Sequence, residues 1–117
     1  MTNRLIIGPK NYSSWSLRPW LVLRWGGIAF SCIQVPLDQP GYGSQAIAML
    51  LALTPNGTVP ALQTGELTIW DSLAIAEWAA EQQPELWPQD PTARAIARAV
   101  TAEMHSGFAA LRRDLPM

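Results

Sequence analysis

The sequence has 117 residues, of which 49% are hydrophobic and 15% charged, with a net charge of −1 and an isoelectric point near 5.7. A chain of this size and composition folds as one compact domain, or as one domain with part of a second, and is not disordered. Because there is no excess of basic residues to neutralise phosphates, we expect no nucleic-acid partner.

The scarcity of cysteine and histidine excludes further classes of protein. Cys32 is the only cysteine, so neither an internal disulfide nor a Cys-x-x-Cys motif is possible within the chain. His105 is the only histidine, so we expect no metal site. No stretch reaches the roughly 18 apolar residues of a membrane span, and the beginning of the chain lacks a secretory apolar run. We therefore predict a cytoplasmic protein with no membrane partner.

Apolar runs and their Gly, Pro and Ser boundaries predict the elements of the fold. In chain order we expect a strand at 4–8, a helix at 17–25, a strand at 30–36, a helix at 44–53, strands at 59–63 and 66–70 around a Thr64-Gly65 turn, a helix at 71–83, and one long helix from Asp90-Pro91 to about Arg113. Cys32 falls within the second strand, where it is expected to be a small buried side chain.

The start of the first helix is predicted from its proline. A proline is tolerated only in the first turn of a helix, where its missing N–H has no partner to lose. With Ser16 as N-cap, Pro19 takes the third helical position. Ser13 and Ser14 then lie in the loop immediately before the helix, and the helix ends at 26–27, a Gly-Gly pair.

This order, β-α-β-α-β-β-α, predicts an α/β fold of thioredoxin-like arrangement. The first two strands are joined through a helix and should be parallel, whereas the hairpin is antiparallel, which makes a mixed four-stranded sheet with helices on both faces. The proline-rich segment 84–91 (PELWPQDP) marks a domain boundary. We predict one domain over residues 1–83, a linker over 84–91, and the start of a second domain over 92–117.

Three stretches at this spacing resemble one family. They are SSWSLR (13–18), NGTVPAL (56–62) and WDSLAIAEW (70–78), and WPQDPTARA (87–95) and EMHSGFAALR (103–112) extend the likeness. The chain resembles the glutathione S-transferases, in particular bacterial serine-type members related to the zeta, maleylacetoacetate isomerase-like class. The resemblance implies glutathione as co-substrate, a homodimer, and an all-helical second domain of which only the opening helix lies in this sequence.

The resemblance gives the Asp-Ser and Val-Pro pairs a role in holding glutathione. Asp71 and Ser72 are by themselves a good helix cap. The resemblance implies that Asp71 accepts the γ-glutamyl ammonium of glutathione. It also implies that Ser72 and the helix N-terminus bind the neighbouring carboxylate. The peptide bond before Pro60 is expected to be cis, so that the Val59 backbone pairs with the cysteinyl unit. Thr58 stands where relatives often hold the glycine end with Lys or Gln.

The serines are expected to stabilise the thiolate of glutathione. A hydroxyl that donates a hydrogen bond to sulfur just before a helix N-terminus favours the anion through both the bond and the helix dipole. Counting back from Arg18 as the arginine of the family assigns this hydroxyl to Ser14, with Ser13 as the alternative. Trp15 stands where zeta members carry cysteine and is expected to line the substrate pocket. His105 is either an inter-helix surface residue or a wall of that pocket.

The predicted function is therefore glutathione transfer to a small electrophile, with no metal and no serine nucleophile. A non-catalytic module of the same fold, binding glutathione or a protein partner, is the alternative. A glutaredoxin-like oxidoreductase ranks last, because Cys32 lies in the wrong element to supply a thiol near the first helix.

Overall fold

A computed structural model describes residues 2–8, 14–35, 54 and 57–114 of the chain. Its elements are β1 (Asn3–Ile7), α1 (Ser14–Trp25), β2 (Ser31–Gln34), β3 (Ala61–Thr64), β4 (Leu67–Trp70), α3 (Ser72–Gln82), the short 3₁₀ helix η2 (Pro84–Leu86), α4 (Pro91–Ser106) and α5 (Ala109–Asp114). The helix predicted at 44–53 lies outside the described residues. The elements otherwise follow the predicted order.

The four strands form one mixed sheet in the order β2-β1-β3-β4. β1 runs parallel to β2, with Leu5 opposite Cys32, and antiparallel to β3, with Leu5 opposite Leu62. β3 and β4 form the predicted antiparallel hairpin. The predicted thioredoxin-like arrangement of a mixed four-stranded sheet with helices is confirmed.

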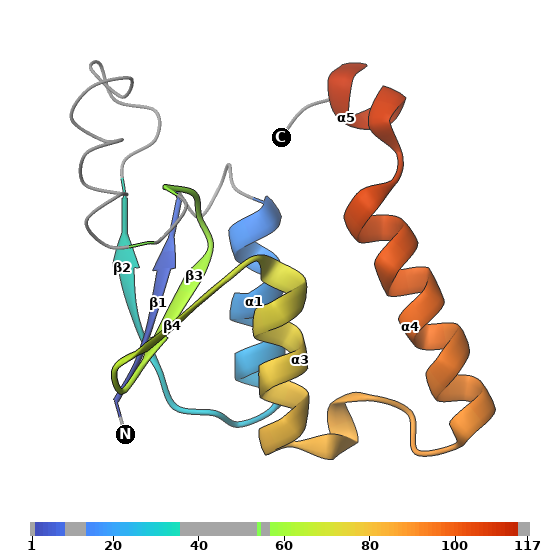
Figure 1. Ribbon diagram of the computed structural model, residues 1–117, viewed down its shortest axis with the longest axis horizontal. Coiled ribbons are helices and arrows are strands. Elements are labelled where there is room, and N and C mark those ends of the chain that lie inside the picture. The colour runs from blue at the N-terminus through green and yellow to red at the C-terminus, as the bar shows by residue number, and fades with distance from the viewer. Residues whose placement is uncertain (1, 9–13, 36–53, 55–56, 115–117) are drawn as a thin grey trace.

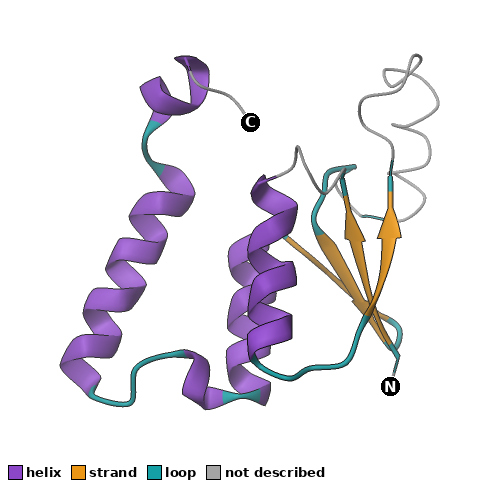
Figure 2. Ribbon diagram, turned by 180° about the vertical axis from the view of Figure 1, so that it is seen from behind, coloured by secondary structure: helices purple, strands orange, loops and turns teal. Residues whose placement is uncertain are grey.

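Alternate residues of β1 supply two separate cores because successive side chains of a strand point to opposite faces. α1 and α3 lie side by side on one face of the sheet, between it and α4 (Figures 1 and 2). The core on this face consists of Leu5, Ile7, Leu23, Leu62, Ile75 and Ala79. Ile6 points to the other face, where it packs with Val35 and Ala61.

The first helix begins earlier than predicted. α1 starts at Ser14, so Ser16 is not the N-cap and Pro19 lies beyond the first turn, at the sixth residue of the helix. The buried Ser16 hydroxyl instead accepts a hydrogen bond from the Gly8 N–H at 3.0 Å. This bond ties the first turn of α1 to the end of β1. A tertiary contact therefore determines where the helix begins, against the local preference of proline.

Replacing Ser16 with alanine should lower the free energy of unfolding by about 1–3 kcal/mol, because the buried Gly8 N–H loses its acceptor. Denaturant unfolding followed by circular dichroism measures the change. Ser31, which is exposed on β2, supplies the matched control: Ser31→Ala should leave the midpoint nearly unchanged. Equal midpoints for the two variants would contradict the assignment.

The end of α1 was predicted correctly, and its geometry explains why. Gly27 has a φ of 67°. Its N–H donates to the carbonyl of Arg24 at 3.1 Å, and the N–H of Ile28 donates to the carbonyl of Leu23 at 3.0 Å. This is the Schellman pattern, which needs a residue that tolerates positive φ directly after the helix.

Two predictions about the strands are wrong in detail. Thr64 pairs with Leu67, so the two-residue turn of the hairpin is Gly65-Glu66, with Gly65 at a φ of 60°. The turn therefore lies one residue later than the predicted turn at Thr64-Gly65. Cys32 is exposed, because β2 lies at the edge of the sheet.

The long final helix predicted to reach Arg113 is divided in two. Asp90 caps α4 as predicted, accepting the N–H of Ala93 at 2.9 Å, with Pro91 in the first turn. The helix then ends at Ser106, and Phe108 has a φ of 59°, which reverses the chain before α5. α4 has no buried residue, and it stands apart from the sheet (Figure 1).

Candidate functional site

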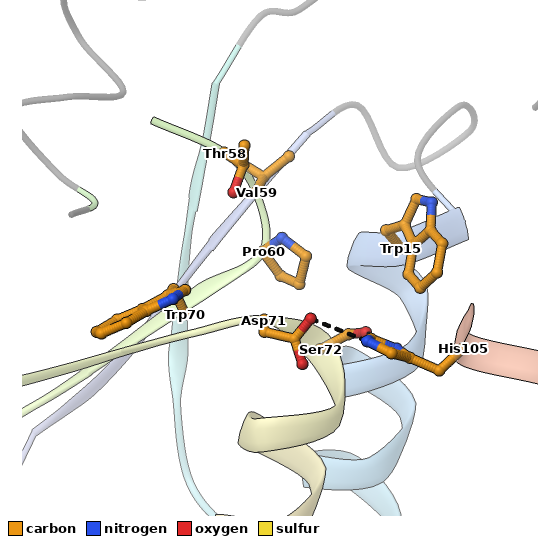
Figure 3. Close-up of a pocket in the computed structure, with 8 residues that line it drawn as sticks. All are labelled: Trp15, Thr58, Val59, Pro60, Trp70, Asp71, Ser72 and His105. Atoms are coloured by element: carbon orange, nitrogen blue, oxygen red, sulfur yellow. Dashed lines mark hydrogen bonds and ion pairs between the residues drawn. The ribbon is translucent and has the colours of Figure 1, made fainter. Parts of the chain in front are cut away.

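One cavity collects residues from four separate parts of the chain. It has a volume of about 560 Å³ and is lined by Trp15, Thr58, Val59, Pro60, Trp70, Asp71, Ser72 and His105. Figure 3 shows these side chains around the start of α3, with Trp15 on the first turn of α1 and His105 reaching in from α4. All of them except Trp70 were predicted as site residues.

Asp71 joins the end of β4 to the start of α3. Its Oδ2 accepts the N–H groups of Leu73 at 3.2 Å and Ala74 at 3.3 Å, so it caps the helix as predicted. Its backbone has a φ of 77°, which residues other than glycine adopt infrequently, with aspartate and asparagine over-represented among those that do. Such a conformation persists where the surrounding structure demands it, often at functional sites.

His105 reaches across from α4 to both cap residues. Its Nε2 lies 3.0 Å from Asp71 Oδ1, and its Nδ1 lies 3.4 Å from the Ser72 Oγ. Ser72 is buried, and the His105 side chain is 25% exposed. His105 lies between α4 and the start of α3 and also lines the cavity, so the choice between its two predicted roles stays a prediction.

Trp15 lies between His105 and two arginines. Its ring meets the imidazole edge to face, with centroids 5.2 Å apart and planes at 87°. The guanidinium carbons of Arg18 and Arg112 lie 4.1 Å and 4.5 Å from the Trp15 ring centroid. Burial, with repulsion from Arg112, lowers the pKa of the Arg18 guanidinium, which still stays protonated. Two positive charges therefore flank the indole at the start of α1.

Arg112 also connects α5 to the end of α4. Its guanidinium donates to the carbonyl of His105 at 3.1 Å and to the carbonyl of Met104. These carbonyls lie in the last turn of α4, whose negative dipole end favours a cation. Arg112 had no predicted role, because the break between α4 and α5 that lets it turn back was not predicted from the sequence.

The serines predicted to face sulfur are only partly described. Ser14 is the half-buried first residue of α1, adjacent to Trp15, but it is not among the residues that line the cavity. Ser13 lies outside the described residues. The choice between the two hydroxyls stays a prediction.

Trp70 is the lining residue that sequence reasoning missed. The residue is 48% exposed. It is the last residue of β4, an edge strand, and it pairs with Ala61 directly after Pro60. Its position just before the capping Asp71 was the signal that could have identified it.

The Thr58-Val59-Pro60 segment forms the opposite side of the cavity from α1 (Figure 3). The Val59–Pro60 peptide bond is cis, as the resemblance implied. Pro60 is buried, whereas Val59 is half-buried and Thr58 is exposed. Residues 58–60 lead directly into β3, so this wall of the cavity belongs to the sheet itself.

The described part of the chain contains neither a metal-binding cluster nor a membrane-spanning helix. No group of three or more His, Cys, Asp and Glu side chains could hold a metal ion there. Among the same residues, no helix is both long and apolar enough to cross a bilayer.

The fold and the site together define a thioredoxin-like domain with a cavity at the start of α3. The sequence profile of the glutathione S-transferase N-terminal domain matches residues 12–82. The chain therefore belongs to the glutathione S-transferase family.

Individual relatives agree with this assignment. The chain is 38% identical over 105 residues to a maleylacetoacetate isomerase of Rattus norvegicus, covering 88% of this chain and 47% of the relative. It is similar to a theta-class glutathione S-transferase of Xanthomonas axonopodis solved with glutathione bound, with a TM-score of 0.73 and 34% identity over 97% of this chain and 53% of the other.

A third similar structure is the holo form of a maleylpyruvate isomerase, a bacterial zeta-class glutathione S-transferase. It has a TM-score of 0.74 and 29% identity, over 93% of this chain and 50% of the other. The chain spans about half the length of the relatives it matches, with 47% of the rat protein covered.

Proposed function

We propose that the chain binds glutathione in the cavity at the start of α3 and stabilises its thiolate for attack on a small electrophile, as a glutathione transferase. The convergence of the predicted residues on one cavity is the observation that carries this proposal. The volume of about 560 Å³ falls within the usual range for small-molecule sites, about 300–1,000 Å³.

Each part of the tripeptide has a proposed partner. Asp71 accepts the γ-glutamyl ammonium, while the Ser72 hydroxyl and the N-terminus of α3 bind the adjacent carboxylate. Val59, held by the bond to Pro60, pairs through its backbone with the cysteinyl unit in the manner of an added strand. Thr58, which is exposed at the rim, is nearest to the proposed glycine end.

Thiolate stabilisation is assigned to the start of α1. Ser14, with Ser13 as alternative, donates a hydrogen bond to the sulfur, and the N-terminus of the helix favours the anion. The charges of Arg18 and Arg112 at Trp15 support this assignment, because a nearby cation lowers the pKa of a thiol. Trp15 and His105 then form the wall against which the electrophile lies.

Glutathione-dependent isomerisation is the second candidate reaction. The similarity to a rat maleylacetoacetate isomerase and to a bacterial maleylpyruvate isomerase favours it. Trp15 stands where zeta members carry cysteine, and for this reason transfer is the first proposal.

Titration calorimetry tests the binding step. We expect saturable binding of glutathione and no comparable binding of the α-linked isomer Glu-Cys-Gly, which carries the same groups but places its amine and carboxylate differently. Absence of glutathione binding would overturn the proposal.

Conjugation of glutathione to a chloronitrobenzene acceptor tests the reaction. Turnover supports the transferase. Binding without turnover, with this acceptor or with an isomerisable diacid, would identify the chain as a glutathione-binding module instead.

We further infer the division into a glutathione-binding domain (1–83), a linker (84–91) and the start of a helical domain (92–117). The short η2 and the absence of any buried residue in the described α4 support it.

Self-association as a homodimer is proposed on the exposed apolar side chains of α4, namely Ile96, Val100 and Met104. The exposed thiol of Cys32 supports a reducing, cytoplasmic location.

A further inference from the structure

The imidazole of His105 contacts Asp71 and Ser72, the two residues proposed to bind the amino-acid end of glutathione. His105 Nε2 is 3.0 Å from Asp71 Oδ1, and His105 Nδ1 is 3.4 Å from Ser72 Oγ (Figure 3). The other carboxylate oxygen of Asp71 already accepts two N–H groups of α3. Within the chain itself, both oxygens of Asp71 and the Ser72 hydroxyl are therefore engaged.

The imidazole of His105 offers one hydrogen-bond donor and one acceptor, as the ammonium and the carboxylate of an α-amino acid do. In the neutral tautomer with its proton on Nε2, His105 donates to the Asp71 carboxylate, as a ligand ammonium would. Nδ1 then carries a lone pair toward the Ser72 hydroxyl, as a ligand carboxylate oxygen would. A ligand with a free amino-acid end needs these same atoms, so it competes with His105 for them.

The contacts that hold His105 in place lie outside the amino-acid subsite. Its ring packs edge to face on Trp15, and its carbonyl accepts a hydrogen bond from Arg112 at 3.1 Å. α4 itself has no buried residue. Segments that bury little apolar surface open at low cost, so the end of α4 can leave the site without disturbing the core.

We propose that His105 is an intramolecular competitor of glutathione. This inference rests on the proposed function: the γ-glutamyl end binds by displacing the imidazole from Asp71 and Ser72. The apparent affinity is then lowered by the fraction of molecules in which His105 occupies the site. The end of α4 thereby sets the affinity of the chain for ligands that carry a free α-amino-acid group.

Substitution of His105 tests the competition. His105→Ala should bind glutathione about fivefold more tightly than the wild type in titration calorimetry, the scale expected from losing one partly exposed pair. His105→Gln should stay close to the wild type, because its amide supplies both a donor and an acceptor. Glu103→Gln, at an exposed position of α4 two residues earlier, is the control and should leave the affinity unchanged.

The displacement itself has a direct spectroscopic signature. His105 is the sole histidine of the sequence, so the Hε1 proton resonance of the tag-free chain identifies it without further assignment. Saturating glutathione should move this resonance away from its position beside the Trp15 ring, toward that of an exposed imidazole. A resonance that does not move at saturation would overturn the inference.

The outcomes separate this inference from the proposed function. If the wild type binds glutathione and His105→Ala binds it equally or less tightly, the competition is refuted while the proposed function stands. If neither chain binds glutathione, both fail. If only the variant binds, His105 occupies the site in nearly all wild-type molecules, which supports the competition while the proposed function of the wild-type chain fails.

Discussion

Replacing Ser14 with alanine is expected to slow the attack of bound glutathione on an electrophile by at most about 25-fold at pH 7, the value for loss of the whole pKa depression. A free thiol has a pKa of about 8.5, and a hydroxyl that donates to the thiolate, together with the dipole of α1, is expected to lower it by about two units. That shift corresponds to about 2.7 kcal/mol. Without the hydroxyl the pKa rises again, and less of the bound thiol is ionised.

The pH dependence makes this prediction specific. Because the thiolate fraction of each chain falls at pH values below its thiol pKa, the loss of rate should grow as the pH is lowered, to at most about a hundredfold below about pH 6, and should disappear above about pH 9. The ultraviolet absorbance of the bound thiolate, followed against pH, measures the shift without any electrophile. A merely structural effect of the substitution would lower activity equally at every pH.

Two further variants identify the hydroxyl. Ser14→Thr retains the donor and should recover most of the low thiol pKa, whereas Ser13→Ala should leave it unchanged. If Ser13→Ala raises the pKa and Ser14→Ala does not, the assignment passes to Ser13. If both variants titrate as the wild type, neither hydroxyl stabilises the thiolate.

Local sequence patterns were sufficient for most of the fold. The caps at Asp71 and Asp90 and the Gly26-Gly27 terminus were predicted correctly, because each depends on a few neighbouring residues and on backbone hydrogen bonds. The parallel pair β1–β2 and the antiparallel hairpin β3–β4 followed from connection length alone.

The errors share a different cause. The start of α1 depends on the Ser16–Gly8 hydrogen bond, which joins residues eight positions apart in different elements. The exposure of Cys32 depends on β2 being the edge strand, a property of the whole sheet. Neither can be read from a window of neighbouring residues.

The residues of the candidate site likewise divide into those that local motifs predict and those that long-range contacts place. The residues at 58–60 and 71–72 were found because the motifs that contain them resemble a family. The contact between His105 and Asp71 spans 34 positions and depends on how α4 lies beside α3, which no local pattern states. The sequence left His105 open between two roles, and the structure places it in the cavity.

Asp71→Asn is expected to weaken glutathione binding by about tenfold or more while leaving the fold nearly as stable. The substitution removes the charge that the γ-glutamyl ammonium needs, and hydrogen bonds to charged groups are worth about 1.5–3 kcal/mol. Asparagine is as good an N-cap as aspartate and tolerates the positive φ at this position, so the bonds from Leu73 and Ala74 survive. Calorimetry gives the affinity, and thermal unfolding gives the stability.

Asp71→Ala is the comparison that separates the two roles of this residue. It should weaken binding as much as Asp71→Asn but also lower the free energy of unfolding by about 1 kcal/mol through loss of the cap. An Asp71→Asn chain that binds glutathione as well as the wild type would show that Asp71 is a cap and nothing more.

The double variant Asp71→Asn with His105→Ala tests whether His105 competes with glutathione through the Asp71 carboxylate. If the imidazole competes mainly through the carboxylate, removing it should improve binding in the wild-type background but far less once the charge of Asp71 is gone. The two substitutions should therefore be non-additive, as expected for residues in direct contact. Additive effects would mean that His105 acts on glutathione through Ser72 or Trp15, and that its contact with Asp71 does not control the site.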